Sequence, residues 1–385
     1  MLNQTHDGVT AANFVLFAMG AGPVPEEYFL FVVQRLGEAS PEWLRANLFL
    51  MYLSNGGAQI DVFDRILFYL SANQEAANLI HVYRLAVAAG VALKLRDTSL
   101  FNAATMMMRE GLHQEAFEIY LSLLPNSPDP GFVKRNILVL ARKYLLPDAI
   151  AFVARTTNEM LDGYSTKRSL TANAVEIDYR GPMDDAAVVS AVLTNGLCVV
   201  RHGCEQQAAE QALRYVANEM QADFPAHFDD EILALIPGMF RFDAKRLARE
   251  ILKYSSELDL KSCVARCVRA GDGKTFTPFH QDVTAFLKAV VNIWTPLTPA
   301  GGDYPSMEFV KKRIGRAEQT KITEGAYNLI EIEESYVMEK YGDLLYRLES
   351  ASPGDCVIFL GSTIHRSSNL AGATKDRYNL EVRFS

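Results

Sequence analysis

Apolar residues recur at intervals of three and four along the first 160 positions, which is the spacing of one face of an α-helix. Residues of this kind form two clear sets: Phe63, Ile66, Leu67 and Leu70, and Ala116, Ile119, Tyr120 and Leu123. Alternating β-branched residues are scarce in this part of the chain. The pattern therefore predicts an all-α N-terminal domain.

One window of this domain resembles a tetratricopeptide repeat, which is a pair of helices repeated about every 34 residues. The window runs from Leu100 to Pro128, with Gly111 at the predicted turn between two helices and Ala116 where the helices would touch. Ala149 follows Ala116 by 33 residues. The usual aromatic and glycine positions of the first helix are not met, so a plain helical bundle remains the alternative to a helical-repeat domain.

The pattern changes at the polar stretch 162–166, DGYST. Beyond it, short apolar or alternating runs predict strands. The predicted strands are 175–179, 196–201, 263–268, 289–294, 355–360 and 378–384, with helices at 184–193 and 245–258. Short strands separated by Gly and Pro indicate a β-sandwich or jelly roll. We expect an α+β chain, in which a helical domain (1–162) precedes a jelly-roll domain (163–385) with flanking helices.

Composition excludes several classes of protein. The chain has 385 residues, 49% of them hydrophobic and 22% charged, so it can bury a large core. The net charge of −8 argues against a nucleic-acid-binding protein, which usually carries a basic excess. Five cysteines without a Cys-x-x-Cys pair predict neither a disulfide framework nor a zinc ribbon. No membrane span or signal peptide is expected, and the cytoplasm is the predicted location.

The most informative motif is His280-Gln281-Asp282, followed by His365 and Arg377. Two imidazoles and one carboxylate suit a mononuclear non-haem Fe(II) centre, because they leave positions open for a co-substrate and dioxygen. On an extended strand, residues i and i+2 point the same way, so His280 and Asp282 can bind one ion. Arg377 is the expected partner of a dicarboxylate such as 2-oxoglutarate, because a guanidinium binds a carboxylate through two parallel hydrogen bonds.

From about residue 170 onward, the order of motifs resembles the phytanoyl-CoA dioxygenase-like branch of the Fe(II)/2-oxoglutarate oxygenases. The matching segments are TPFHQD (277–282), VNIWTPL (291–297), GGDYPSMEFV (301–310), PGDCVIFLGSTIHRSSN (353–369) and RYNLEVRF (377–384). His-x-Asp alone is common by chance, and the ordered set with Pro-Gly-Asp before the second histidine is far more specific. The resemblance covers a little over half of the chain.

The resemblance implies a role for each matching position. His280, Asp282 and His365 would bind Fe(II), and Arg377 would pair with the distal carboxylate of 2-oxoglutarate. Trp294 and Ser367 fall where this branch often has cofactor-contacting residues. The implied reaction converts 2-oxoglutarate and dioxygen to succinate and carbon dioxide while a substrate C–H becomes C–OH. Related halogenases carry a small residue in place of the carboxylate, so Asp282 favours hydroxylation, or a related desaturation or cyclisation.

Five of these residues have either a rival elsewhere in the chain or a plain structural interpretation. His227 and Asp229 form a second His-x-Asp, which we interpret as a loop entering a helix. Arg383 lies six residues after Arg377 on the same face of the predicted last strand and is the rival for 2-oxoglutarate. The other two side chains have purely structural alternatives: Trp294 as part of the core and Ser367 as the partner of a turn.

Two further segments are candidates for contact with a substrate. The basic run Lys311-Lys312-Arg313 with Arg316 could meet an anionic handle on a substrate or could be a solvated surface. The stretch 327–350 is a candidate lid, and the alternative is an amphipathic helix packed outside the sheet.

Three functional hypotheses follow. The first is an Fe(II)- and 2-oxoglutarate-dependent hydroxylase of a small-molecule or carrier-bound substrate, with a possible protein partner bound by residues 1–162. The second is a non-catalytic scaffold that acts through the helical domain, since helical repeats usually present a concave binding surface. The third is a cupin-like metal enzyme that uses no 2-oxoglutarate. The substrate itself cannot be inferred, because specificity depends on the pocket rather than on the fold.

Overall fold

The computed structural model describes residues 60–127, 130–165, 174–219, 226–228, 230–253, 257–258, 263–318, 320–321, 330–368 and 372–385. The chain divides into two compact units, Met1–Ala149 and Ile150–Ser385. The division falls within helix α9 (Pro147–Leu161), whereas the sequence pattern placed a boundary at 162, where the helical pattern ends.

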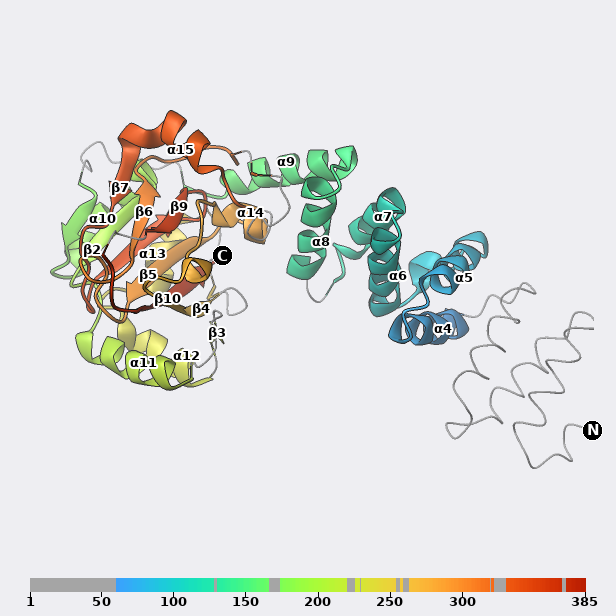
Figure 1. The fold of residues 1–385 in the computed structure, drawn as a ribbon, viewed down its shortest axis with the longest axis horizontal. Coiled ribbons are helices and arrows are strands. Elements are labelled where there is room, and N and C mark those ends of the chain that lie inside the picture. The colour runs from blue at the N-terminus through green and yellow to red at the C-terminus, as the bar shows by residue number, and fades with distance from the viewer. Residues whose placement is uncertain are drawn as a thin grey trace, which may run out of the picture. The chain divides into compact units, whose positions relative to one another are not determined.

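The described part of the N-terminal unit is helical (Figure 1). Its elements are α4 (Ile60–Ala72), α5 (Ala76–Ala88), η2 (Ala92–Lys94), α6 (Asp97–Arg109), α7 (His113–Leu123), α8 (Pro130–Arg142) and the start of α9. The apolar stripes seen in the sequence are buried, including Phe63 and Tyr120. Gly111 joins α6 to α7 with φ +81°, a conformation that glycine adopts without strain. The tetratricopeptide assignment stays a prediction, and Pro128 lies outside the described residues.

The second unit contains a seven-stranded sheet. Its strands, in spatial order, are β1 (Glu176–Asp178), β2 (Leu197–Arg201), β8 (Cys356–Leu360), β5 (Val291–Pro296), β10 (Arg377–Phe384), β4 (Val264–Val268) and β3 (Ala226–His227). All neighbouring strands are antiparallel except β1 and β2. A smaller sheet has the order β7 (Leu345–Arg347), β6 (Ser306–Val310) and β9 (His365–Ser368).

The chain passes repeatedly between the two sheets. After β4 the chain pairs with the small sheet at the bridge between His280 and His365, and it returns to the large sheet as β5. It then forms β6 and β7 in the small sheet, β8 in the large sheet, β9 in the small sheet and β10 in the large sheet. Alternation of this kind is how two-sheet jelly rolls are connected. The mixed α+β class is therefore confirmed, and the small sheet lies across from the centre of the large one (Figure 1).

The two faces of the large sheet pack against different partners. One face joins helices α10 (Asp185–Asn195), α11 (Gln206–Glu219), α12 (Asp230–Met239) and α13 (Ala244–Ile251) in a continuous apolar core. The other face contributes Trp294, Val357 and Phe359 to a cluster with Met307 and Phe309 of the small sheet. Alternate residues of each strand point to opposite faces, so one strand serves both clusters.

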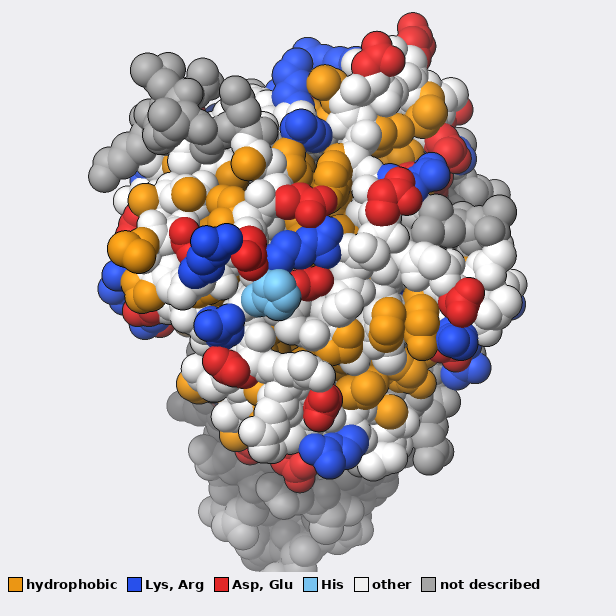
Figure 2. Space-filling model, turned by 90° about the vertical axis from the view of Figure 1, so that its left-hand side faces the viewer, with side chains coloured by type: hydrophobic (Ala, Val, Ile, Leu, Met, Phe, Trp, Pro, Cys, Tyr) orange, Lys and Arg blue, Asp and Glu red, His pale blue; other side chains and the backbone are white. Residues whose placement is uncertain are grey.

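The remaining elements are short. They are η3 (Pro182–Asp184), η4 (Gly273–Thr275), α14 (Asp282–Phe286), α15 (Glu334–Tyr341) and η6 (Gly342–Leu344). Among the described residues, no helix is both long enough and apolar enough to cross a membrane. On the face drawn in Figure 2, acidic and basic side chains are interleaved around a histidine, and no broad basic area is visible there.

All six strand predictions are confirmed to within two residues. The apolar runs correspond to strands buried on both faces, such as β5 and β8, whereas polar and apolar residues alternate along β10. The helix predicted at 245–258 is too long. It ends at Ile251, because Leu252 is extended and Leu258 pairs with Phe384 at the end of β10.

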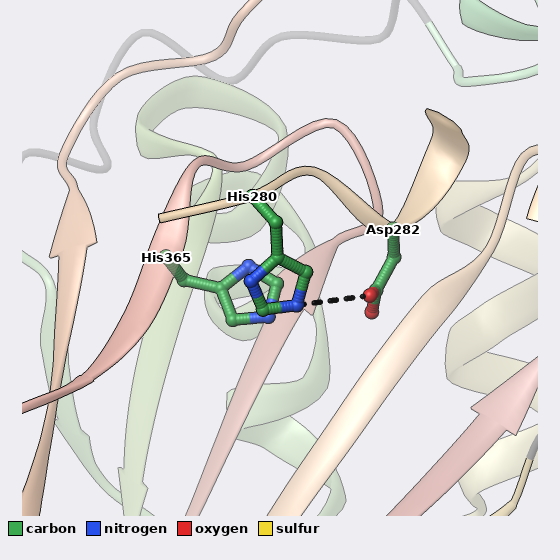
Figure 3. A group of neighbouring side chains, drawn as sticks. All are labelled: His280, Asp282 and His365. Carbon is green, nitrogen blue, oxygen red and sulfur yellow. Dashed lines mark ion pairs between the residues drawn. The ribbon is translucent and has the colours of Figure 1, made fainter. Parts of the chain in front are cut away.

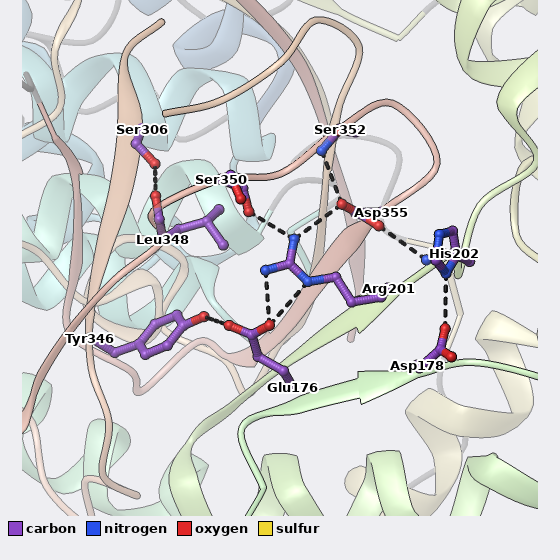
Figure 4. Close-up of polar contacts among 10 residues, drawn as sticks. All are labelled: Glu176, Asp178, Arg201, His202, Ser306, Tyr346, Leu348, Ser350, Ser352 and Asp355. Atoms are coloured by element: carbon purple, nitrogen blue, oxygen red, sulfur yellow. Dashed lines mark hydrogen bonds and ion pairs between the residues drawn. The ribbon is translucent and has the colours of Figure 1, made fainter. Parts of the chain in front are cut away.

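An ion-pair network closes the β1 edge of the large sheet (Figure 4). Arg201 binds Glu176 at 2.9 Å and Asp355 at 3.1 Å, and it also donates to the carbonyl of Ser350 at 2.7 Å. Asp355 further accepts from the backbone N–H of His202 at 3.0 Å. One guanidinium thus joins β1, β2 and the loop before β8.

Candidate metal and co-substrate site

His280, Asp282 and His365 converge although 85 residues separate the first from the last (Figure 3). One ligand atom from each lies within 4.8 Å of the others, and all three residues are buried. The backbones of the two histidines form a mutual bridge, with N···O distances of 3.0 and 3.1 Å. Their rings are therefore adjacent, with centroids 4.2 Å apart.

Both imidazoles are oriented in the same way by their own chain. The Nδ1 atom of His280 lies 2.8 Å from the carbonyl of Pro278, and that of His365 lies 3.0 Å from the carbonyl of Thr363. Each Nδ1–H can donate to the carbonyl two residues earlier, which leaves Nε2 available as a ligand. His280 Nε2 is 3.5 Å from Asp282 Oδ1.

The segment that carries His280 differs in one respect from the strand expected there. Gln281 is extended, with φ −124° and ψ 127°, but Asp282 is the first residue of helix α14. A carboxylate in the first turn of a helix is stabilised by the partial positive charge of the N-terminus. The expected convergence of His280 and Asp282 thus comes from a strand-to-helix junction instead of a continuous strand.

The protonation states of Asp282 and His365 suit a metal ion. Burial alone would raise the pKa of Asp282, but Arg383 and the two histidines lower it far below its usual range. Burial and the neighbouring His280 lower the pKa of His365 to about 4. A carboxylate and a neutral imidazole are the forms that bind metals, so these two ligands need no deprotonation at neutral pH.

Arg383 contacts the acidic ligand directly. Its Nε lies 3.6 Å from Asp282 Oδ2 and donates to Asn292 Oδ1 at 2.8 Å. Its Nη2 is 2.5 Å from Glu381, which in turn is 2.7 Å from Arg266. A chain of alternating charges therefore runs from the triad across the inner face of the large sheet.

Arg377 lies on the same strand and has different surroundings. It is 1% exposed, and its Nη1 donates to the carbonyl of Ser306 at 2.5 Å. Within the described chain, its Nε has no hydrogen-bond partner and no carboxylate lies within ion-pair distance. Burial lowers the pKa of Arg377 to about 9. A buried guanidinium without an acidic partner is costly, so this position is suited to an anionic ligand.

Trp294 and Asn379 lie beside Arg377. The Arg377 guanidinium carbon is 5.3 Å from the centre of the Trp294 ring, and Trp294 Nε1 has no partner among the described residues. Asn379 is fully buried, and both ends of its amide are likewise unpartnered within the described chain. Ser367 is different, because its hydroxyl already pairs with Thr277 at 3.0 Å.

Of the histidine and aspartate in the second His-x-Asp, the structure describes only the backbone of His227. His227 is on β3 at the edge of the large sheet, paired with Val264. Asp229 lies outside the described residues, and helix α12 begins at Asp230.

Sequence reasoning missed the polar inner face of β10. Arg377, Asn379, Glu381 and Arg383 occupy alternate positions, and their intervening neighbours Tyr378, Leu380, Val382 and Phe384 pack in the apolar core. The signal was present as strict alternation of polar and apolar residues in RYNLEVRF. This alternation predicts a strand with one solvent-exposed face. That the polar face is enclosed becomes clear only from the position of the second sheet.

No protein-family model matches the chain, and no curated protein matches it either. Among solved structures, the epimerase SnoN in complex with Fe3+, alpha ketoglutarate and nogalamycin RO is similar over 53% of this chain and 84% of its own, with 12% identity and a TM-score of 0.40. AviO1 from Streptomyces viridochromogenes Tue57 matches over 53% and 96%, with 15% identity and a TM-score of 0.36. The apo non-heme monooxygenase ThoJ matches over 51% and 76%, with 15% identity and a TM-score of 0.34. Similarity this low does not assign a function, which therefore depends on the geometry of the site.

Proposed function

We propose that the chain is an Fe(II)- and 2-oxoglutarate-dependent oxygenase whose jelly-roll domain, residues 163–385, belongs with the phytanoyl-CoA dioxygenase-like enzymes. The observation that carries the proposal is the pairing of two sites within one sandwich. His280, Asp282 and His365 form a buried three-ligand cluster, and Arg377 is a buried cation without a carboxylate partner in the described chain.

The donor set fits ferrous iron. Two imidazole nitrogens and one carboxylate oxygen would bind the ion and leave its other positions for small molecules. When bound there, Fe(II) would supply the redox chemistry that activates dioxygen. Arg383 would keep Asp282 ionised and fix its outer oxygen, so that Oδ1 faces the two imidazoles.

The donors beside Trp294 fit the far end of a keto diacid. Arg377 would bind the distal carboxylate of 2-oxoglutarate, and Trp294 Nε1 and the Asn379 amide would complete its hydrogen bonds. Ser367 would contribute only by exchanging its bond to Thr277 for one to the ligand. In the proposed overall reaction, a substrate C–H group, dioxygen and 2-oxoglutarate are converted to a C–OH group, succinate and carbon dioxide.

Hydroxylation is the proposed outcome, because a carboxylate at position 282 occupies the place that a halide would need. The substrate would be a small molecule or a group attached to a carrier. Residues 1–162 would bind a protein partner or the carrier. No nucleic acid is expected as a partner of a chain with net charge −8.

The deciding experiment is an anaerobic Fe(II) titration with and without 2-oxoglutarate. A weak visible band near about 500 nm is expected when a keto acid chelates Fe(II) at open positions. Admission of oxygen should remove the band and release succinate, and Asp282→Ala should abolish both signals.

Two other outcomes would replace the proposal. Iron binding without the band would favour a cupin-like metal enzyme that uses no 2-oxoglutarate. Absence of iron binding, together with a partner interaction that needs residues 1–162 but not His365, would favour a non-catalytic scaffold.

A further inference from the structure

Gln281, the residue between two of the candidate ligands, binds three backbone groups on the side away from the triad. Its Nε2 donates to the carbonyl of Ser362 at 2.6 Å and to that of Arg316 at 3.2 Å. Its Oε1 accepts from the backbone N–H of Glu318 at 2.8 Å. The side chain is fully buried. It therefore joins the segment of His280, the loop before His365 and the segment 316–318.

Glu318 is in turn the centre of a second set of bonds. Its carboxylate accepts from Tyr336 at 2.5 Å, Tyr341 at 2.5 Å, Lys340 at 2.7 Å and Arg316 at 3.1 Å. The carboxylate side chain is 2% exposed although it lies among charged donors. Three of these four donors belong to helix α15, so Glu318 fastens that helix to the segment held by Gln281.

An apolar cluster connects the same helix to both histidine segments. Phe279 and Ile364, which immediately precede His280 and His365, pack in one cluster with Val337 and Tyr341 of α15. Both apolar residues are at most 1% exposed. The helix therefore packs against the residues that precede both histidines, and Figure 1 shows it beyond one end of the small sheet.

An ionic contact adds a third connection. Arg366, directly after His365, is paired with Glu334 at the start of α15 and lies 4.1 Å above the ring of Phe279. Polar, apolar and ionic contacts thus link α15 to residues adjacent to both histidines. The two histidine segments are also joined directly, by the mutual bonds of His280 and His365 and by the bond from the backbone N–H of Ser367 to the carbonyl of Thr277 at 3.0 Å. The contacts of α15 add to these bonds from one side, at residues next to each ring.

We infer that Glu318 and Gln281 are positioning residues, through which helix α15 sets the separation and orientation of His280 and His365. This inference rests on the proposed function, since it takes the triad to be a divalent metal site. Residues that orient metal ligands from outside commonly change metal affinity by 10- to 100-fold when they are altered.

The most direct test is Glu318→Gln in the full-length chain. Glutamine keeps the size of the side chain but has one acceptor oxygen and an NH2 group, so it cannot accept from four donors. Co(II) serves as the probe, because its binding and its ligand-field absorption can be measured without turnover. Glu339→Gln, an exposed site on the same helix, is the matched control.

We expect Glu318→Gln to bind Co(II) about tenfold more weakly than the wild type and with an altered absorption spectrum, while its far-UV circular dichroism is unchanged. Glu339→Gln should match the wild type in all three measurements. Lys340→Met removes one donor, and the double variant Glu318→Gln/Lys340→Met should be no weaker than Glu318→Gln alone, because residues in one network are not additive.

Tyr336→Phe replaces Glu318→Gln in the test if the latter does not fold, because it removes a single hydrogen-bond donor to Glu318 and retains the ring. It should weaken Co(II) binding in the same direction by a smaller factor. The inference would be overturned if a folded Glu318→Gln protein had the wild-type Co(II) affinity and spectrum. If Glu318→Gln does not fold, the same result for Tyr336→Phe would overturn it. If the wild type itself binds no Co(II), the proposed function fails instead, so the two failures are distinguishable.

Discussion

At the scale of single residues, the structure separates two arginines that the sequence left as rivals. Arg377 and Arg383 share a face of β10, yet their neighbours differ. Arg383 contacts the candidate ligand Asp282 and is balanced by Glu381, whereas Arg377 lies against Trp294 and has no acidic partner in the described chain. Identical side chains on one strand thus have different surroundings.

Arg377→Met should raise the dissociation constant for 2-oxoglutarate by about 10- to 100-fold, since hydrogen bonds to a charged group contribute about 1.5–3 kcal/mol. Fe(II) binding without the co-substrate should be nearly unchanged. The measurement is anaerobic titration of the visible band.

The variant Arg383→Lys should show the opposite effect, with Fe(II) binding weakened more than 2-oxoglutarate binding. It keeps the charge near Asp282 and Glu381 but loses the planar group that binds Asn292, so Fe(II) affinity should fall about tenfold. Its effect on 2-oxoglutarate affinity should be smaller than that of Arg377→Met. A reversed pattern, with Arg383 controlling the co-substrate, would contradict the assignment.

At the scale of elements, polar clusters hold the edges of the sandwich where the apolar cores end. The network of Arg201 fixes the β1 edge, and the bonds of Glu318 fix helix α15. Both centres are buried or half-buried and serve several partners, which distinguishes them from isolated surface pairs, whose contribution is usually below about 1 kcal/mol.

Arg201→Met should destabilise the second unit by about 1–3 kcal/mol, because it removes the charged donor of Asp355, which is only 10% exposed. Arg180→Met is the control. Arg180 is 81% exposed in its pair with Asp178, so its loss should change stability by no more than about 0.5 kcal/mol. Thermal unfolding checks both, and equal effects would show that the network does not act as described.

The bonds of Glu318 predict a pH dependence of the metal-free protein. Burial raises the pKa of Glu318, but Lys340, the two tyrosines and Arg316 lower it more, to about 2. An unfolded glutamate has a pKa near about 4.3. The stabilising contribution is therefore complete above about pH 4.3 and is lost as the pH falls toward about 2.

The measurement is the difference in unfolding temperature between the wild type and Glu318→Gln, followed from neutral to acidic pH. The difference should be largest at neutral pH and should shrink below about pH 4. For Glu339→Gln it should stay near zero throughout. A difference that grows on acidification would have the wrong sign for a carboxylate with a lowered pKa.

Elements were predictable where the signal is local, and contacts between distant segments were not. Strand patterns and helical spacing depend on neighbours in the chain, so the strands and the helices around Phe63 and Tyr120 were found. Gln281 looked like the unspecified residue of a motif, because its partners Glu318 and Ser362 are 37 and 81 residues away. The triad was predictable because the matching motifs around its residues occur in order, although His-x-Asp alone is common by chance.

At the scale of the whole molecule, the candidate site lies entirely in the unit Ile150–Ser385. The sequence indicated two parts from the change in periodicity. It gave no signal for a division within α9, because the helical pattern continues through that helix to Leu161.

Metal addition should therefore stabilise one unit selectively. A ligand present at a hundredfold excess over its dissociation constant stabilises the folded state by about 2.7 kcal/mol. Calorimetry should show two transitions, only one of which shifts upward with Co(II), and chelator should reverse the shift. Asp282→Ala should abolish the shift without moving the other transition. An equal shift of both transitions would show that the units unfold together.

The eight residues of strand β10 are divided between two faces, one polar and one apolar. Its even-numbered positions are part of the apolar core, and its odd-numbered positions line the enclosed polar face. Tolerance to substitution along this strand should consequently oscillate with a period of two, between variants that fail to accumulate and variants that accumulate but are inactive. Evolution can therefore replace the polar residues of this strand one at a time, and so change its chemistry, while the apolar residues of the other face keep their packing.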